Sequence, residues 1–521
     1  MVSFALTEED KRLLSSRGIS EGEVLRQLEL LRNPPPRIEL IRPCTVGDGI
    51  KRLPEGGHER WLELHEEAAS AGRFTKFVPA SGAATRMFRT LVSFWKGGNG
   101  LTLDEIRRRA STGDKEAREL LTFFEGLPRF AFYDDLRDAM AADGLSLEDE
   151  LAKGRVLTVL EYLLGPKGLN YASLPKGLLK FHRYPEGGRT AFEEHLVEAA
   201  HYVRDGQGIC RLHFTVSPEH RRAFEELYQK VRPHYEERFG VKFEVSFSEQ
   251  SPSTDTIALD SEGNLFRLSD GTLLLRPGGH GALLGNLQAL EGDLVYIKNI
   301  DNVVPDHLKP PTVHWKRVLG GYLVEMEREL HGYLAEMADG GGDLGQILEF
   351  ARECFCIELP EGWEEMGDGE RRTFLLEELN RPLRVCGVVP NEGEPGGGPF
   401  WVRDRDGRAR LQIVEEAQID MTSPEQREIW SRSTHFNPVD IVCSLRDFKG
   451  RPFDLERFVD PEAVIITSKS KDGRPLKALE RPGLWNGAMA GWLTVFVEVP
   501  PETFNPVKVV NDLLREAHQP R

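Results

Sequence analysis

The segment from residue 76 to residue 88 combines residue types that could bind a phosphate group. An apolar strand leads into a run of small side chains, after which Thr85 and Arg86 open a predicted helix. Small residues let backbone N–H groups approach an anion closely, a helix N-terminus carries partial positive charge, and an arginine offers a forked donor. The pattern predicts a phosphate-binding loop, although an ordinary strand, turn and helix packed on a sheet has the same pattern. The candidate residues are Ala80, Ser81, Gly82, Ala83, Thr85 and Arg86.

Polar residues follow two predicted strands further along the chain. Gln250 comes after the strand at 242–247 and offers both a donor and an acceptor to the edge of a nucleotide base. Asp301 and Asn302 come after the strand at 293–298. A carboxylate at the carboxyl end of a strand suits Mg²⁺, which takes one or two carboxylates together with phosphate and water. An Asx-turn explains the Asp-Asn pair equally well.

Two further segments could contact a nucleotide. The proline before Lys176 fixes an extended approach, so the ammonium group could lie beside phosphates, although a Pro-Lys pair is also common in surface turns. Residues 276–284 form a second glycine-rich loop before a predicted helix, in which Gly279 and Gly281 let a planar ligand approach the backbone. His280 between them could contact the ligand or cap the helix.

The elements around these segments alternate between predicted strands and predicted helices. Strands at 210–216 and 241–246 flank a helix at 218–239, which is the spacing of right-handed βαβ units. Residues 101–164 have helical periodicity, which predicts a helical insertion. The sequence therefore predicts an α/β fold with a mainly parallel, mixed sheet flanked by helices. The predicted domains are a helical brace at 1–72, a nucleotide-binding core at 73–320 with an insertion at about 97–170, a helical connector at 321–380, and a sugar-phosphate-binding α+β part at 381–521.

The C-terminal half contains residues that could hold a sugar phosphate. Glu392 lies in a glycine-rich loop at 390–401, which is either a linker or a ligand loop, since Asn and Glu side chains hydrogen-bond sugar hydroxyls. Three lysines follow a predicted strand at 463–466, and such a group forms either a solvated hairpin tip or a phosphate site. A last helix is predicted at 505–515. The lysines are Lys469, Lys471 and Lys477.

Composition limits the partners and the compartment. The chain has 67 Lys and Arg against 84 Asp and Glu, and its net charge of −17 disfavours broad binding to nucleic acid or to an acidic membrane. A polyanionic ligand therefore requires a local basic pocket. Six cysteines without a framework spacing fit free thiols in a reducing compartment, although Cys354 and Cys356 could form half of a metal site. No apolar run approaches the roughly 20 residues that span a bilayer, so we predict a cytoplasmic protein.

Five motifs occur in the order found in UDP-sugar pyrophosphorylases, and the chain resembles this family of sugar nucleotidyltransferases. Over nearly its full length it also resembles an uncharacterised bacterial family known as a domain of unknown function, which names no activity. The chain departs from the pyrophosphorylases in having alanine where they usually have glycine in the first loop, and in a longer span before Lys176. The motifs are the small-residue loop with Thr85 and Arg86, Lys176, Gln250, the loop at 277–281, and Asp301 with Asn302.

The resemblance to pyrophosphorylases implies a GT-A-like fold and a role for each matching residue. It places a triphosphate on residues 81–86 with Lys176 beside it, the base at Gln250 and Gly279, and Mg²⁺ on Asp301. By analogy the nucleotide is UTP. The implied sugar contacts are Asn302, Asn437 and Glu415, with Glu416 as the alternative to Glu415.

The predicted activity is that of a Mg²⁺-dependent sugar nucleotidyltransferase, which forms a nucleotide sugar and pyrophosphate from a nucleoside triphosphate and a sugar 1-phosphate. The attacking phosphate is already ionised, so the reaction needs positioning and charge neutralisation, by Arg86 and Lys176, more than a general base. No Walker phosphate-binding loop is present in the sequence. A non-catalytic nucleotide-binding protein and a glycosyltransferase on a similar sheet remain alternatives, and the sequence leaves the sugar and the oligomeric state open.

Overall fold

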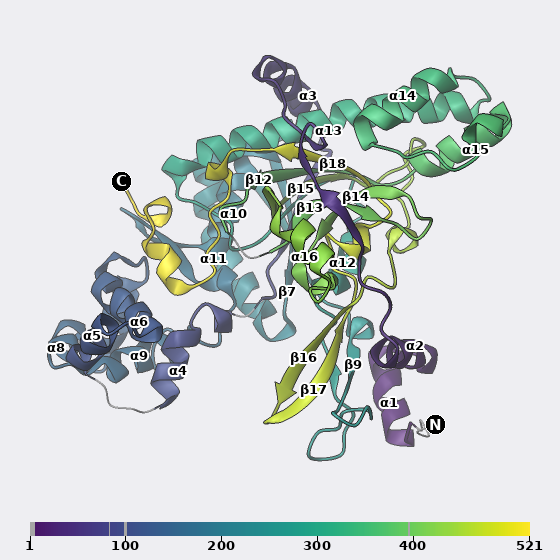
Figure 1. The fold of residues 1–521 in the computed structure, drawn as a ribbon. Coiled ribbons are helices and arrows are strands. Elements are labelled where there is room, and N and C mark those ends of the chain that lie inside the picture. The colour runs from purple at the N-terminus through teal and green to yellow at the C-terminus, as the bar shows by residue number, and fades with distance from the viewer. Residues whose placement is uncertain (1–5, 83, 98–101, 394–395) are drawn as a thin grey trace. The chain divides into compact units, whose positions relative to one another are not determined.

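The computed structural model of the protein describes residues 6–82, 84–97, 102–393 and 396–521. Its largest sheet is mixed and mostly parallel, with helices on its flanks (Figure 1), which confirms the predicted fold class. The nine strands of this sheet are, in spatial order, β2 (Thr45–Val46), β3 (Gly49–Lys51), β18 (Leu493–Glu498), β12 (Leu383–Pro390), β15 (His435–Ser444), β11 (Leu294–Lys298), β4 (Phe74–Pro79), β7 (Ile209–Val216) and β8 (Lys242–Glu249).

Two compact units divide the chain. Unit 1 comprises the residues up to Phe77 together with Ser248–Ile297 and Arg317–Pro501. Unit 2 comprises Val78–Phe247, Lys298–Lys316 and Glu502–Arg521. The strands β4 and β11 begin in unit 1 and end in unit 2. The four domains drawn from the sequence stay a prediction.

The strands β12 and β18 of unit 1 are buried along nearly their whole length and consist mostly of apolar residues. Only the last residue of β12 is exposed, which is typical of a strand covered on both faces. One cluster of buried side chains joins Phe77 of β4, Ile297 of β11, Val388 of β12 and Phe496 of β18. In the sheet, β12 pairs in parallel with β18 and antiparallel with β15, so the cluster packs on strands of both orientations. The core therefore holds in place the residues of β4 and β11 that belong to unit 1.

Two smaller sheets and a set of helices complete unit 1. Two helices begin the part of the chain predicted as a helical brace: the Thr7 side chain forms a capping box at the start of α1 (Glu8–Arg17), and the Ser20 side chain caps α2 (Glu21–Arg32). The smaller sheets are β10 (Leu275–Arg276), β9 (Thr256–Leu259), β17 (Arg474–Glu480) and β16 (Ile465–Lys471), and β1 (Leu40–Pro43), β13 (Gly398–Arg403) and β14 (Ala409–Val414). The helices are α1 (Glu8–Arg17), α2 (Glu21–Arg32), α3 (His58–Ser70), α12 (Leu284–Gln288), α14 (Leu344–Phe355), α15 (Asp368–Leu379) and α16 (Pro424–Ser431).

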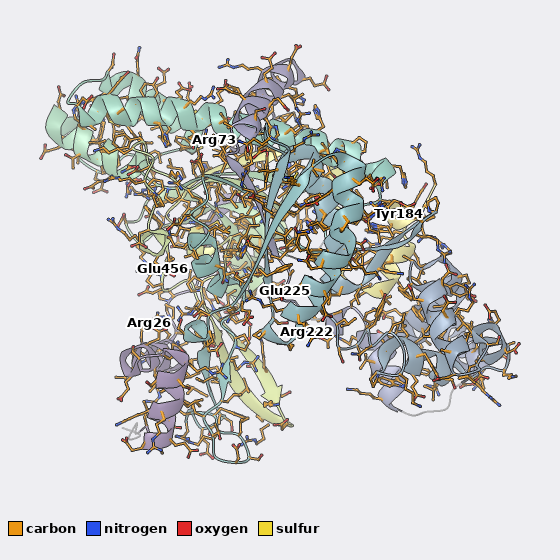
Figure 2. The ribbon with its side chains drawn as sticks, turned by 180° about the vertical axis from the view of Figure 1, so that it is seen from behind. Arg26, Arg73, Tyr184, Arg222, Glu225 and Glu456 are labelled. Atoms are coloured by element: carbon orange, nitrogen blue, oxygen red, sulfur yellow. The ribbon has the colours of Figure 1, made fainter. Side chains whose placement is uncertain are left out.

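A long helix, α13 (Lys309–Ala338), begins in unit 2 and continues through unit 1. An arginine joins it to the sheet: Arg73, labelled in Figure 2, donates two hydrogen bonds to Asp293 (2.6 and 3.0 Å) and one to Glu327 of α13 (2.7 Å). Arg73 directly precedes β4 and Asp293 directly precedes β11. These contacts tie the helix to the amino ends of both strands.

Unit 2 contains β7, β8 up to Phe247, two helices and the predicted helical insertion. The insertion is confirmed as helical over residues 103–164, and its helices lie together in Figure 1. The helices of the insertion are α5 (Leu103–Ser111), α6 (Lys115–Gly126), α7 (Tyr133–Ala142), α8 (Leu147–Ala152) and α9 (Val156–Leu164), and α4 (Arg89–Gly97) precedes them. The other elements of unit 2 are the hairpin of β5 (Lys180–Tyr184) and β6 (Gly187–Thr190), α10 (Ala191–Tyr202) and α11 (Arg221–Phe239).

Two expectations about helices are wrong. The helix predicted to open at Thr85 begins only at Arg89, after a short 3₁₀ turn at Ala84–Arg86, so a helix N-terminus does not contribute its charge at Thr85. The segment predicted as a helix at 505–515 consists of an extended stretch and one 3₁₀ turn at Val510–Leu514, and a second 3₁₀ turn follows at Glu516–His518. Pro506 has no N–H to give to a helix, and this stretch pairs with residues 301–302 instead.

None of the helices in the described part of the chain has both the length and the apolar character needed to cross a bilayer.

Candidate functional site

The carboxyl ends of β4 and β11 define the position of the first candidate site. The two strands are parallel neighbours, with Phe74 opposite Leu294 and Phe77 opposite Ile297, so they end at the same edge of the sheet. The chain continues from β4 into the loop at 80–86 and from β11 into residues 299–302, and both segments belong to unit 2. This is the edge at which open α/β sheets bind ligands.

Asp301 lies at this edge between two lysines. The Lys176 ammonium group contacts Asp301 Oδ2 at 2.7 Å and donates to the carbonyl oxygen of Val507 at 2.6 Å, and the Lys508 ammonium lies 3.6 Å from the same carboxylate. Burial raises the pKa of Asp301, but the two ammonium groups outweigh burial and hold the pKa below its ordinary value. The side chain of Lys508 remains half exposed. We call Asp301, Lys176, Lys508 and Val507 the Asp301 cluster.

The loop at 80–86 approaches the Asp301 cluster through its backbone. The Ala84 N–H donates to the carbonyl oxygen of Leu174, two residues before Lys176, and the Ala80 N–H donates to Thr215 of β7. Gly82 is exposed and has open space where a Cβ would stand. The loop residues Thr85 and Arg86 are also exposed, Ser81 is half-buried, and Ala83 lies outside the described residues. Arg86 has no ion pair within the described part of the chain, so its guanidinium is available to an anion.

The donor set at Asp301 contains a single carboxylate. Among the described residues, no three His, Cys, Asp or Glu side chains gather in a way that could hold a metal ion. The side-chain oxygen of Asn302 accepts a hydrogen bond from the Asn505 N–H at 3.0 Å. Proteins usually bind Mg²⁺ through one or two carboxylates, and phosphate oxygens and waters complete the coordination shell. With one carboxylate, the site fits Mg²⁺ only when a phosphorylated ligand is bound as well.

A second group of predicted residues meets in unit 1, around the loop at 277–281. The His280 ring stacks on Trp485 with centroids 4.2 Å apart, its Nδ1 accepts from the Leu484 N–H at 3.0 Å, and its Nε2 lies 3.8 Å from Glu415 Oε1. Burial lowers the pKa of His280, while Glu415 and Glu480 act in the opposite direction. We call His280, Trp485, Glu415 and Glu480 the His280 cluster.

The glycines beside His280 are required by the backbone of the loop. Gly279 has a φ of +78°, and a Cβ there would lie 3.0 Å from Glu480 Oε2. A Cβ on Gly281 would lie 1.9 Å from the carbonyl oxygen of Pro482. The loop is therefore seated directly on the segment that follows β17.

Gly281→Ala is expected to destabilise the protein by about 1–3 kcal/mol, because the added methyl group must displace the Pro482 backbone. Urea unfolding would measure this loss. The matched control is Gly285→Ala in α12, where a Cβ meets nothing within 4 Å and alanine favours the helix, so its stability should be unchanged or slightly higher. Equal stability of the two variants would contradict the close seating of the loop.

The remaining predicted residues of unit 1 differ in their surroundings. Lys469 pairs with Glu480 at 2.5 Å, which places it beside the His280 cluster. Gln250 donates to Thr254 Oγ1 at 3.1 Å, and the Thr254 carbonyl accepts from Arg481, the residue after Glu480. Both residues are therefore linked to the end of β17, Lys469 through Glu480 and Gln250 through Thr254 and Arg481.

Other predicted sugar-phosphate residues lie apart from the His280 cluster. Lys477 donates to the carbonyl oxygen of Leu31 in the last turn of α2, and Lys471 pairs with Asp472 at the exposed hairpin tip. Glu392 is exposed in its loop. Asn437 is buried in β15, its side-chain oxygen accepts from the Val439 N–H at 3.3 Å, and its amide nitrogen has no partner among the described residues.

Lys508 and Trp485 are the site residues that sequence reasoning misses. Lys508 lies in the segment predicted as a helix, and the signal that could reveal it is Pro506, which disfavours a helix there. Trp485 lies in a Pro-Gly-Leu-Trp-Asn-Gly stretch whose turn residues are visible in the sequence. Its contact with His280 depends on chain segments about 200 residues apart.

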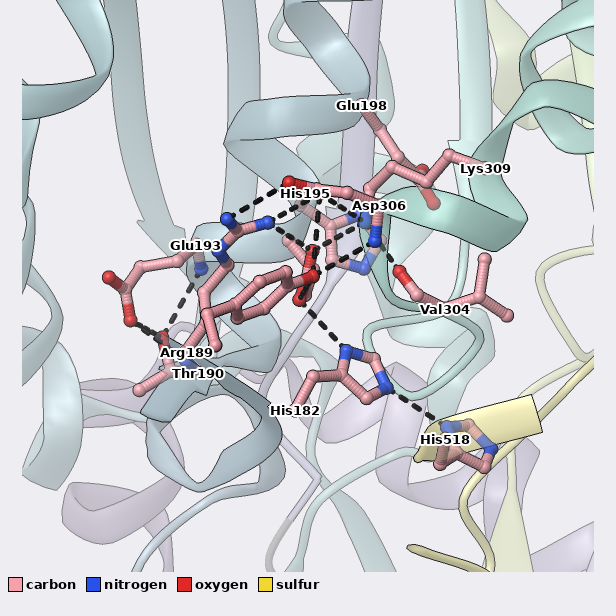
Figure 3. A network of polar contacts seen from close by, with 12 residues as sticks. His182, Arg189, Thr190, Glu193, His195, Glu198, Val304, Asp306, Lys309 and His518 are labelled. Carbon is pink, nitrogen blue, oxygen red and sulfur yellow. Dashed lines mark hydrogen bonds and ion pairs between the residues drawn. The ribbon is translucent and has the colours of Figure 1, made fainter. Parts of the chain in front are cut away.

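A buried polar network in unit 2 includes His518, which belongs to the same C-terminal segment of the chain as Lys508 (Figure 3). Glu194 of α10 contacts Lys309 at 2.5 Å, His182 Nδ1 at 2.8 Å and Arg189 at 3.1 Å. The other ring nitrogen of His182 lies 3.0 Å from His518 Nδ1. The network therefore joins α10, β5 and the last residues of the chain.

Comparison with known proteins finds solved structures that align with most of the chain at low sequence identity. No curated protein matches it in sequence. The UDP-N-acetylglucosamine pyrophosphorylase of Trypanosoma brucei aligns with a TM-score of 0.48 and 14% identity, over 98% of this chain and 79% of that one. The UDP-glucose phosphorylase of the same organism gives 0.47 and 14%, over 98% and 80%. The UDP-glucose pyrophosphorylase of Leishmania major gives 0.42 and 11%, over 98% and 79%.

A family model matches nearly the whole sequence, which confirms the predicted family resemblance. The model is described as "Domain of unknown function (DUF4301)" and covers residues 7–519. The chain belongs to this family.

Proposed function

We propose that the protein is a sugar nucleotidyltransferase, which joins a nucleoside triphosphate to a sugar 1-phosphate and releases pyrophosphate. The observation that carries the proposal is the Asp301 cluster: one carboxylate and two ammonium groups at the carboxyl ends of two parallel strands, beside the loop at 80–86. A site for two phosphorylated substrates needs several cationic groups in one place, and this acidic chain provides them there.

In the proposed reaction a phosphate oxygen of the sugar 1-phosphate attacks the α-phosphorus of the triphosphate in line. The bond from the α-phosphorus to its bridging oxygen breaks, and pyrophosphate leaves with the electron pair. The attacking oxygen is ionised at neutral pH, so no proton must be removed. Lys176, Lys508 and Arg86 would bind the triphosphate and neutralise the charge that develops on the leaving group.

Mg²⁺ held by Asp301 and by phosphate oxygens would supply further charge neutralisation when bound. In the same proposal Gln250 and the 277–281 loop contact the base, with UTP favoured by analogy, and Asn302, Glu415 and Asn437 contact the sugar. Lys469, Lys471, Lys477 and Glu392 remain proposed contacts of the sugar phosphate. The reaction is proposed for the cytoplasm.

The first experiment is a pyrophosphate-release assay with each nucleoside triphosphate and a panel of sugar 1-phosphates. We expect release with one sugar phosphate in the presence of Mg²⁺, and a loss of at least about 100-fold when the metal is removed by EDTA, because one carboxylate cannot replace the metal's charge. Coupling to inorganic pyrophosphatase and a phosphate assay would measure it.

A reaction without sugar phosphate is the control, because hydrolysis of the triphosphate would release products there too. Saturable nucleotide binding by calorimetry without any release across the panel would contradict catalysis and favour a binding protein. Transfer of a sugar from a nucleotide sugar, without pyrophosphate, would favour a glycosyltransferase.

A further inference from the structure

Unit 1 contains a cavity of about 790 Å³ that is lined by none of the residues predicted to bind a nucleotide or a sugar. It lies between the β2–β3 segment, the start of α3, the middle of α13, the end of α14 and single residues of β14 and β18. Cavities of about 300–1,000 Å³ are the size that holds small organic ligands. The volume is therefore sufficient for a ligand of one or two rings with a polar substituent.

The cavity has one cationic side chain without a partner. Lys51 has no side-chain hydrogen bond or ion pair within the described residues. By contrast, the two lining arginines are paired: Arg52 contacts Glu498 at 2.7 Å, and Arg60 contacts Glu325 at 2.6 Å. An anionic group in the cavity would therefore find a single available ammonium group.

Aromatic rings and thiols form an uncharged part of the lining. Trp61 and Tyr322 meet edge to face with centroids 5.3 Å apart, and the Trp61 N–H donates to Glu325 at 2.7 Å. Burial raises the pKa of Cys354 to about 11 and also raises the pKa of Cys356, so both lining thiols are neutral at pH 7. Such walls suit the flat apolar body of a ligand.

The charge of the lining limits the charge of the ligand. Glu325 and Glu353 both line the cavity, and Arg60 already neutralises Glu325. A nucleotide or another polyphosphate, with several negative charges, would therefore meet the Glu353 carboxylate and have only the Lys51 ammonium group to balance it within the described lining. A carboxylate with one negative charge matches the single ammonium group. The lining thus selects against phosphorylated substrates of the kind proposed for the Asp301 cluster.

We propose that this cavity is a second binding site, which takes a small aromatic or alicyclic monocarboxylate with its carboxylate on Lys51 and its ring beside Trp61 and Tyr322. The site is separate from the proposed nucleotidyltransferase chemistry, and its test does not depend on turnover.

The test compares two probes of the same shape, 1-naphthoate and neutral 1-naphthamide, by calorimetry on the full chain at pH 7.5. The wild type is expected to bind the acid about tenfold more tightly than the amide, because only the acid forms a charge-assisted hydrogen bond with Lys51. Lys51→Gln should abolish this preference. The matched control is Glu353→Gln on the same lining, which should keep or increase the preference because it removes a negative charge.

Alkylation of the thiols locates the bound probe. Cys354 and Cys356 are half-buried at the cavity, whereas Cys44, Cys210, Cys386 and Cys443 are buried. Saturating 1-naphthoate is expected to slow the reaction of the two lining thiols with N-ethylmaleimide several-fold, as measured by peptide mass spectrometry. The proposal is overturned if neither probe binds saturably, if the wild type binds acid and amide equally, or if alkylation of these thiols is unchanged at saturation.

Discussion

Asp301→Asn is expected to lower pyrophosphate-forming turnover about 100-fold or more. The substitution keeps the shape of the side chain but removes the negative charge that Lys176 contacts at 2.7 Å and Lys508 at 3.6 Å. Without it the two ammonium groups repel each other, and the oxygen donor proposed for Mg²⁺ is weakened. Loss of one preorganised charged group in an active site typically costs a factor of 100 to 1,000. Steady-state kinetics of pyrophosphate release would measure the loss, with circular dichroism to verify the fold.

Lys508→Gln tests the same cluster without risk to the fold, because the Lys508 side chain is half exposed. We expect about a tenfold loss of turnover, since Lys176 remains as the nearer cation. The matched control is the Lys180–Asp135 ion pair of unit 2, in which the ammonium contacts Asp135 at 2.6 Å outside the candidate site. Lys180→Gln and Asp135→Asn should leave turnover unchanged. Normal turnover of both Asp301→Asn and Lys508→Gln would refute the assignment of the site.

The elements of the fold were predictable wherever apolar periodicity determines them. The strands at 74–79, 294–298 and 383–390 are apolar runs between turn residues, and such runs predict buried strands from local sequence. The capping box at Thr7 is equally local, because its partner is three residues away. The helical insertion was predictable for the same reason.

Elements that depend on distant partners were not predictable. Residues 505–507 are extended because they pair with residues 301–302, some 200 positions earlier, and this pairing overrides the helical pattern that follows. The contact of Asp301 with Lys176 joins two positions 125 residues apart. Both residues are recognisable as candidates by type and position, but only the tertiary structure shows that they touch.

The lysines of the β16–β17 hairpin show that the same limit applies to single residues. These lysines form one basic group in the sequence, but the structure gives each of them different surroundings. Lys469 pairs with Glu480, Lys471 lies at the hairpin tip, and Lys477 donates to the last turn of α2. Because alternate residues of a strand point to opposite faces, Lys469 and Lys471 share a face, but the twist and end of the hairpin give them different neighbours. Spacing in the sequence therefore does not determine whether cations act together.

The buried network of unit 2 carries the second large effect: Glu194→Gln is expected to lower the free energy of unfolding by about 3–5 kcal/mol. Glu194 is fully buried and accepts contacts from Lys309, His182 and Arg189, so its removal leaves two cations in a low-dielectric environment. Urea unfolding followed by circular dichroism would measure the change. The control is Glu186→Gln: Glu186 is an exposed partner of Arg189 at 3.8 Å, and its loss should cost less than about 1 kcal/mol.

The pH dependence of unfolding gives an independent readout of this network. Burial raises the pKa of Glu194, but Lys309 and His182 outweigh burial and hold this pKa below its ordinary value. The Glu194 carboxylate therefore stabilises the folded state fully at pH values above its pKa in the unfolded chain, and this stabilisation is lost as the pH falls. In the folded state, burial and the neighbouring His182 lower the pKa of His518 to about 3. When the pH falls below about 6.5, the ordinary pKa of histidine, His518 is therefore protonated in the unfolded state but not in the folded state. Stability should therefore decline on acidification by up to about 1.4 kcal/mol per pH unit for His518 alone. His518→Gln should flatten the decline between pH 6.5 and 4.5, whereas His234→Gln, at an exposed position of α11, should leave it unchanged. An identical slope in the wild type and His518→Gln would show that His518 is not held neutral by the fold.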